Sequence, residues 1–273
     1  MNRECGDELE EAYPCERIVT TAERGAMHNK EYATYGEKIA EIYDELVLVP
    51  EDAEYAASFL SELAGSGVAA KALELGIGTG RIALPLAQTG IEVHGIDASE
   101  SMVKKLRAKP GGRDIPVNIG NFADLRLEER FSLVYVVFNT FFGLLSQEEQ
   151  VRCFENAARH LGDGGAFVIE AFVPEMSRYD KDQRVEVHHL GGDHVILGAA
   201  THDPLDQRIS ASHLVISEGG IQLYPVELRY AWPSELDLMA RLAGLELHKR
   251  WGGWHREPLT KASDKHVSVY VRG

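Results

Sequence analysis

Residues 72–81 read ALELGIGTGR, and the fold of the chain follows from this stretch. The apolar run before the glycines predicts a short buried strand, and residues 81–88 after them predict a helix that begins directly at the turn. Gly76, Gly78 and Gly80 lack a Cβ, so the backbone can adopt positive φ angles and a ligand can approach it closely. Unpaired N–H groups at the start of the helix favour an anionic or polar group there. A strand, a glycine turn and a helix in this order predict a site for part of a nucleotide-like ligand.

A second predicted strand, residues 91–97 with the sequence IEVHGID, ends in Asp97. A carboxylate at the end of the second strand of a βαβ unit can accept hydrogen bonds from a ribose, in dinucleotide enzymes and with other nucleoside cofactors. The dinucleotide fingerprint is G-x-G-x-x-G/A, whose third small residue allows close packing of helix and strand. Arg81 occupies that position here. A nucleoside without a pyrophosphate is therefore the better ligand, and an NAD-type oxidoreductase is the disfavoured alternative.

Two motifs resemble those of the class I S-adenosylmethionine (SAM) dependent methyltransferases. They are Glu74-x-Gly76-x-Gly78-x-Gly80, and Gly95-Ile96-Asp97-Ala98-Ser99 with Met102 following. The resemblance covers about residues 32–175 well and roughly the last forty residues more loosely. By layout the chain is most similar to small-molecule methyltransferases such as the aminosugar N,N-dimethyltransferases. The resemblance implies an α/β fold with a Rossmann-like, mostly parallel sheet and an antiparallel last strand. It also implies SAM as cofactor and methyl transfer to a nitrogen or oxygen of a small-molecule acceptor.

The resemblance further implies roles for residues of the cofactor site. Asp97 would take the ribose hydroxyls, Glu74 would meet the methionyl ammonium directly or through water, and the glycine backbone would approach the carboxylate end. Around the adenine, the implied residues are Ala98, Met102, Asn121 and Phe122. Asn121 stands where the family usually has an acid, but its amide oxygen can still accept a hydrogen bond from an exocyclic N–H.

The leading segment supplies two tyrosines. In the family a helix before the glycine motif caps the cofactor, and a tyrosine in the context Y-D-x-h, where h is hydrophobic, bonds the methionyl carboxylate. Tyr43-Asp44-Glu45-Leu46 matches that context, and Tyr35 lies on the same segment. The alternative for Tyr43 is a plain core aromatic.

The carboxyl end of the predicted strand 131–138 is where ligands bind in open α/β sheets, so Phe138 and Asn139 are expected near the transferring methyl group. Because the sulfonium of SAM is already activated, orientation and water exclusion are the protein's main tasks. An amine acceptor need only be neutral, whereas a hydroxyl benefits from a base. Leu144 stands where some sugar dimethyltransferases carry His or Tyr and cannot be that base. The candidate catalytic residues are Asn139 and His255, although an exposed loop position is the alternative for His255.

Five segments are expected along the chain. They are a flexible tail 1–27, a helical cap 28–67, a SAM-binding core 68–175, an antiparallel β insertion 176–231 and a C-terminal completion of the core 232–273. Four alternating stretches separated by turn residues predict the insertion. It could wall the substrate pocket or pair two subunits as a homodimer. A catalytically silent scaffold of the same fold is a further alternative, which the intact Glu74, glycines and Asp97 disfavour.

Composition limits the classes of function. The net charge of −15 argues against a nucleic-acid partner, since binding a phosphate backbone needs a basic face. No apolar run approaches the roughly eighteen residues of a membrane span. The three cysteines are not in metal spacing, which favours a reducing cytoplasm. His188 and His189 in the insertion are adjacent and expected on opposite faces of a strand, which is poor geometry for a metal, so no metal is predicted.

Overall fold

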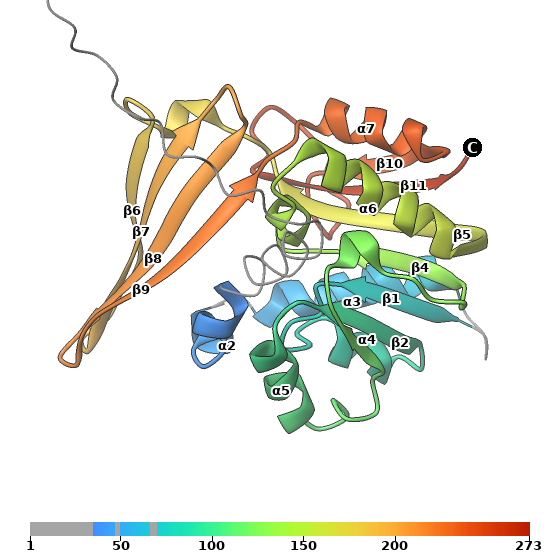
Figure 1. The fold of residues 1–273 in the computed structure, drawn as a ribbon, viewed down its shortest axis with the longest axis horizontal. Coiled ribbons are helices and arrows are strands. Elements are labelled where there is room, and N and C mark those ends of the chain that lie inside the picture. Colours follow the sequence, from blue (N-terminus) through green and yellow to red (C-terminus); the bar gives the residue numbers. More distant parts are fainter. Residues whose placement is uncertain (1–34, 47–49, 66–69) are drawn as a thin grey trace, which may run out of the picture.

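The computed structural model describes residues 35–46, 50–65 and 70–273 (Figure 1). The expected tail and the first part of the expected cap therefore lie outside the described residues. Residues 35–39 are helical. The named helices are α2 (Tyr43–Leu46), α3 (Pro50–Ala64), α4 (Ala83–Gln88), α5 (Glu100–Ala108), α6 (Gln147–His160) and α7 (Pro233–Leu242). None of the helices in these ranges is long and apolar enough to cross a membrane.

A seven-stranded sheet forms the centre of the core, in the order β10-β11-β5-β4-β1-β2-β3. Its strands are β1 (Lys71–Leu75), β2 (Glu92–Asp97), β3 (Val117–Ile119), β4 (Phe131–Val136), β5 (Leu161–Phe172), β10 (Leu245–Trp251) and β11 (Lys265–Arg272). β1 to β5 pair in parallel, and β11 is antiparallel to both β5 and β10. The mostly parallel sheet with an antiparallel last strand is confirmed.

Helices cover both faces of this sheet, which explains why its central strands are apolar on both sides. Leu73 and Val134 pack with α6 and α7 on one face, whereas Ala72 and Leu133 pack with α3 and α4 on the other. Residues 162–165 read GDGG, a sequence typical of a turn, yet they belong to β5. Leu161 pairs with Phe131 and extends the strand, with an irregularity in the register that absorbs the glycines.

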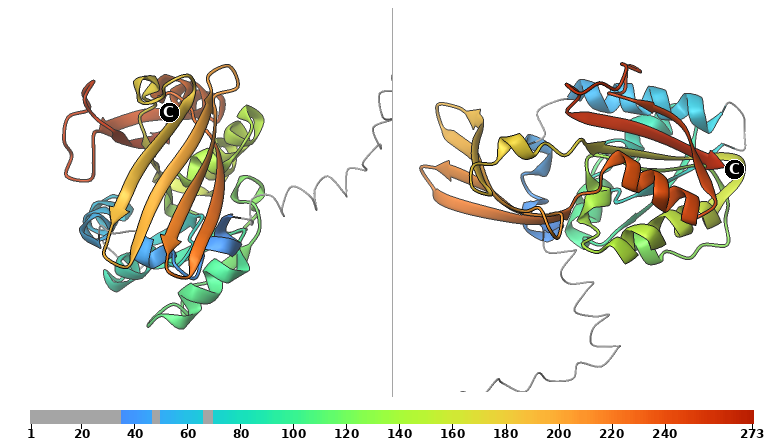
Figure 2. Two further views of the ribbon diagram at one scale, coloured as in Figure 1. Left: turned by 90° about the vertical axis from the view of Figure 1, so that its left-hand side faces the viewer. Right: turned by 90° about the horizontal axis from the view of Figure 1, so that it is seen from above.

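A separate antiparallel sheet stands beside the core (Figures 1 and 2). It consists of β6 (Gln183–Leu190), β7 (His194–Asp203), β8 (Arg208–Ser217) and β9 (Gly220–Arg229), joined in that order. We call the face that carries the buried side chains of Ile196, His202 and Ile209 the inner face, and the opposite face the outer face. Both further views show α2 between the inner face and the core (Figure 2). The predicted four-stranded antiparallel sheet is confirmed.

A β-bulge in β6 overturns the expectation for the adjacent histidines. The register shifts between Val187 and His189, so that His188 is an extra residue in the strand. The His188 ring lies over Gly198 and His213, and the His189 ring stacks on His194, with centroids 4.7 Å apart. Both rings therefore lie on the inner face, and the prediction of opposite faces is wrong. Even so, no three metal-ligating side chains gather into a metal site within the described ranges.

Candidate cofactor site

The three glycines of the motif serve different purposes. All have positive φ, at 75° for Gly76, 54° for Gly78 and 78° for Gly80. A Cβ on Gly76 would lie 2.3 Å from Thr140, and one on Gly80 would lie 2.3 Å from Leu106, so these two glycines are required by packing. A Cβ on Gly78 would meet nothing within 4 Å. Gly78 is therefore the position where the backbone stays open to a ligand.

Asp97 is tied to this open turn. Its Oδ2 accepts a hydrogen bond from the Gly78 amide at 2.7 Å, and its Oδ1 accepts one from the Ser99 amide at 2.8 Å. Burial raises the pKa of Asp97, while these amide bonds act in the opposite direction. Each oxygen keeps further acceptor capacity. Ser99 then caps α5 by accepting from the amide of Met102, which is itself buried. The carboxylate, Ala98 and the start of α5 are thus held beside the glycine turn.

Glu74, which is buried, and Arg81, which is half-buried, lie close enough at this edge of the sheet for each to shift the pKa of the other. Glu74 accepts a hydrogen bond from the Tyr135 hydroxyl at 3.0 Å, and burial raises the pKa of Glu74 to about 8. The Arg81 guanidinium carbon lies 3.2 Å from the centre of the Phe138 ring. Burial lowers the pKa of Arg81, and its Nε is buried without a hydrogen-bond partner among the described residues. A buried, unsatisfied donor of this kind needs an acceptor.

The carboxyl end of β4 has an uncommon backbone conformation. Phe138 and Asn139 both have positive φ, at 54° and 63°. The Glu170 carboxylate accepts from the Phe138 amide at 2.7 Å, and the Asn139 side-chain oxygen accepts from the Phe172 amide at 2.6 Å. These two bonds hold the turn that presents the Phe138 ring to Arg81. The Asn139 carboxamide oxygen therefore already has a structural role.

The helical segment 35–46 lies over the glycine turn. The Thr79 hydroxyl donates to Asp44 at 2.6 Å, and the Ser99 hydroxyl donates to Glu37 at 2.7 Å. Burial raises the pKa of Tyr43, and the charged groups that act on its hydroxyl include Arg81 and Asp97. Tyr43 thus lies near Arg81 and Asp97, and its contact with the cofactor stays a prediction.

The remaining predicted residues are more distant from this centre. Tyr35 packs in a cluster with Met102 and Tyr224 of β9. The Asn121 side chain accepts from the Ala123 amide at 2.9 Å and caps the short helix that contains Phe122, so contact of either residue with adenine stays a prediction. His255 is exposed, with its ring on Tyr55 of α3 at 3.9 Å between centroids. The structure does not bring His255 together with the other candidate residues.

The family follows from comparison with known proteins. A family model described as a methyltransferase domain matches residues 72–165. The chain is 34% identical over 201 residues to the cypemycin N-terminal methyltransferase of a Streptomyces species, a match that covers 73% of this chain and 82% of that relative. The chain belongs to the class I SAM-dependent methyltransferases. This methyltransferase is also similar to the solved structure of the CcbJ methyltransferase from Streptomyces caelestis. This chain and CcbJ are 45% identical, and their structures superpose with a TM-score of 0.83 over 89% of this chain and 99% of CcbJ.

A more distant structure supports the fold. DesVI of Streptomyces venezuelae is 21% identical with a TM-score of 0.65, over 86% of this chain and 98% of the other. The cofactor of this methyltransferase is SAM. The site fits it in three respects that do not depend on the comparisons, namely the open backbone at Gly78, the carboxylate of Asp97 and the unsatisfied Nε of Arg81.

The sequence pattern did not predict a role for Arg81 at the cofactor site. Arg81 counted only against a dinucleotide, although a cation in the first turn after the glycine motif was itself a signal. Glu170 was also missed, and nothing in its strand sequence sets it apart.

Proposed function

We propose that this methyltransferase transfers the methyl group of SAM to an amine nitrogen of a small-molecule acceptor. The observation that carries the proposal is the sequence FNTFFGL at residues 138–144, the carboxyl end of β4. This segment holds no side chain that titrates near neutral pH. The nearby Glu170 is buried, bonded to the Phe138 amide, and 3.6 Å from the Lys265 ammonium. A neutral amine can attack without a protein base, whereas a hydroxyl benefits from one.

The residues described above would then divide the cofactor between them. Bound SAM supplies a methyl group already activated by its sulfonium. Asp97 would accept the ribose hydroxyls, Glu74 would hold the ammonium and Arg81 the carboxylate of the methionyl end, with Tyr43 closing the site. Ala98, Met102, Asn121 and Phe122 would contact the adenine. Asn139 would shape the turn beside the reacting atoms, and the amine proton would pass to solvent after transfer. The name of the cypemycin relative, an N-terminal methyltransferase, supports a nitrogen acceptor.

Matched acceptors test the choice between nitrogen and oxygen. We expect amines to gain a methyl group, measured by mass, while the corresponding alcohols do not react. We also expect the rate for each amine to follow the pKa of that amine, because the neutral form is the nucleophile. His255→Ala should leave this rate within about twofold. Methylation of the alcohols, or a strong loss of rate in His255→Ala, would instead favour a hydroxyl acceptor with a histidine base.

Cofactor binding should release a proton near neutral pH. Because burial raises the pKa of Glu74 to about 8, this carboxyl is largely protonated at pH 7 before it meets an ammonium. As the pH is raised toward 8, the affinity for S-adenosylhomocysteine should therefore increase by up to about tenfold per pH unit. Above pH 8 the affinity should level off. Calorimetry at pH 7 in buffers of different ionisation enthalpy should show close to one proton released. Glu74→Gln should abolish the release, and Glu92→Gln, at an exposed position, should not. A binding enthalpy that is independent of buffer contradicts the role of Glu74.

We also propose that two copies pair through the outer face of the second sheet. Its strand register aligns two aliphatic rows, Val195-Ile216-Ile221 and Leu197-Leu214-Leu223. Aliphatic side chains at the two edge strands are between 58% and 78% exposed, and they are Val185, Val187, Leu190, Ile221 and Leu223. These aliphatic rows can meet their own copy without burying a charge, although the chain as a whole is strongly acidic.

The oligomeric state tests this pairing. The wild type is expected to sediment at twice the chain mass of 30.2 kDa. Leu223→Glu should shift it to the monomer, since two buried carboxylates would face an apolar surface. Leu205→Glu, in the exposed turn between β7 and β8, is the matched control and should leave the dimer intact. A monomeric wild type at micromolar concentration overturns the proposal.

A further inference from the structure

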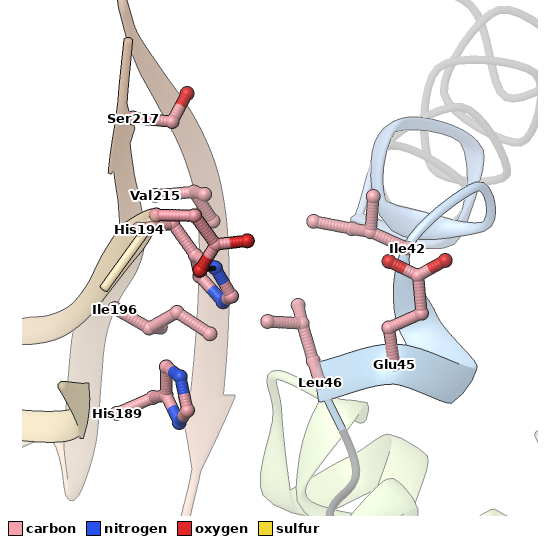
Figure 3. A pocket seen from close by; sticks show the side chains of 9 residues that line it. Ile42, Glu45, Leu46, His189, His194, Ile196, Val215 and Ser217 are labelled. Atoms are coloured by element: carbon pink, nitrogen blue, oxygen red, sulfur yellow. Dashed lines mark hydrogen bonds and ion pairs between the residues drawn. The ribbon is translucent and has the colours of Figure 1, made fainter. Parts of the chain in front are cut away.

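A cavity of about 320 Å³ lies between α2 and the inner face of the second sheet. Ile42 and Leu46 point toward Ile196 and Val215 across it (Figure 3). Ile196 and Val215 are directly paired between β7 and β8, so they form one row of the sheet. The volume is in the range of small-molecule sites. The cavity therefore has two aliphatic walls, one from the helical segment and one from the sheet.

The lining favours a hydrocarbon over a sugar. Of the nine lining residues four are aliphatic, and no Phe, Tyr or Trp is among them. The other five lining residues are polar, and they are Glu45, His189, Asp193, His194 and Ser217. A sugar ring held between the two aliphatic walls would leave the hydroxyl groups that face these walls without partners, which costs free energy. An alkyl chain gains from each methylene that leaves water. The walls thus match an apolar arm of an acceptor.

The polar groups of the cavity disfavour an anion. The Glu45 carboxylate lines the cavity and makes no ion pair with another described residue. The Asp193 carboxylate is 2.9 Å from the His194 ring. With these two carboxylates beside it, the cavity favours a neutral or cationic ligand, as an amine acceptor would be.

The cavity shares a wall with the cofactor site. Tyr43 is in the same helical turn as Ile42 and Leu46, but the charges acting on it belong to Glu74, Arg81 and Asp97. The helix therefore has one side toward the cofactor and another toward the cavity. A helix with its side chains is about 10 Å across, so about that thickness of protein separates the cavity from the side of the helix that faces the cofactor site.

We propose that this cavity is a distal acceptor subsite, which holds an unbranched aliphatic arm of an amine substrate. This rests on the proposed amine acceptor and adds to it the part of the substrate that determines specificity. Ile196 and Val215 set how long an arm the subsite can hold, because they form its wall on the sheet.

Straight-chain primary amines from butylamine to decylamine test the proposal. Each is titrated into the protein saturated with S-adenosylhomocysteine. We expect the Kd to fall about three- to fourfold per added methylene until the cavity is full, and then to stay constant. Val215→Phe makes the cavity smaller, so the plateau should be reached at a shorter amine. Ile196→Ala makes it larger, so the plateau should be reached at a longer amine. A misfolded protein would not shift the plateau in opposite directions for the two variants.

A surface control and a second readout separate the outcomes. Leu205→Glu, in the exposed turn between β7 and β8, should leave the plateau unchanged, whereas a loss of chain-length dependence in this variant would place the binding outside the cavity and overturn the proposal. The proposal is also overturned if affinity keeps rising with chain length, without a plateau, in both the wild type and Val215→Phe. Methyl transfer to each amine is measured in parallel by mass. Amines that bind with the expected plateau and are never methylated contradict the amine function alone, and methylated amines without chain-length dependence contradict the subsite alone.

Discussion

Asp97→Ala is expected to weaken the binding of S-adenosylhomocysteine by about 100-fold or more. The carboxylate would lose its hydrogen bonds to the ribose, and a bond to a charged group contributes about 1.5–3 kcal/mol. It would also release the Gly78 and Ser99 amides, to which it is bonded at 2.7 and 2.8 Å. Calorimetric titration measures the loss, and thermal unfolding shows whether the variant remains folded.

Two further variants make the Asp97 result specific. Asp97→Asn keeps one acceptor oxygen and a similar shape, so we expect a smaller loss of about tenfold. Asp124→Ala removes an acid that follows β3 and pairs with Arg152 at the surface, and it should change affinity less than about twofold. Unchanged affinity in a folded Asp97→Ala protein would show that the ribose is held elsewhere.

Arg81→Met is expected to weaken the binding of S-adenosylhomocysteine about 30- to 100-fold, whereas the binding of methylthioadenosine should change less than about twofold. Methylthioadenosine keeps the adenine and ribose but has neither carboxylate nor ammonium. The guanidinium lies on the Phe138 ring with its Nε unsatisfied among the described residues, so a carboxylate would complete its hydrogen bonds. Methionine retains much of the apolar stem. Calorimetry with both ligands measures the difference.

The two ligands distinguish Arg81 from Asp97. Asp97→Ala should weaken both compounds, because both contain the ribose. Arg113→Met removes one positive charge from an exposed position and should affect neither. If Arg81→Met weakens the two ligands equally, the guanidinium stabilises the site as a whole and does not recognise the carboxylate.

The comparison of sequence and structure is clearest at the glycine motif. Spacing alone predicted the strand, the turn and the acid of the next strand, because these depend on local backbone geometry and on the βαβ connection. It could not distinguish the three glycines. Only the packing of Thr140 against Gly76 and of Leu106 against Gly80 leaves Gly78 as the open position.

The histidines of the insertion show the same limit. Alternation along a strand is a local rule, and it predicted opposite faces for His188 and His189. The bulge is set by how β6 pairs with β7, which involves residues on another strand. The position of the His255 loop relative to α3 could not be predicted from the sequence. In the structure the His255 ring packs on Tyr55 of α3.

The sequence by itself determined the fold class and the presence of a four-stranded insertion, and it predicted Glu74 and Asp97 as residues of the cofactor site. These follow from periodicity and from short motifs whose residues are near one another in the chain. Only the tertiary structure decided that the Arg81 guanidinium lies on Phe138 with its Nε unpartnered among the described residues, that Glu170 holds the turn at Asn139, and that a cavity opens between α2 and the second sheet. The physical reason is that burial, charge pairing and cavities arise from side chains far apart in sequence, and no local pattern records which of them meet.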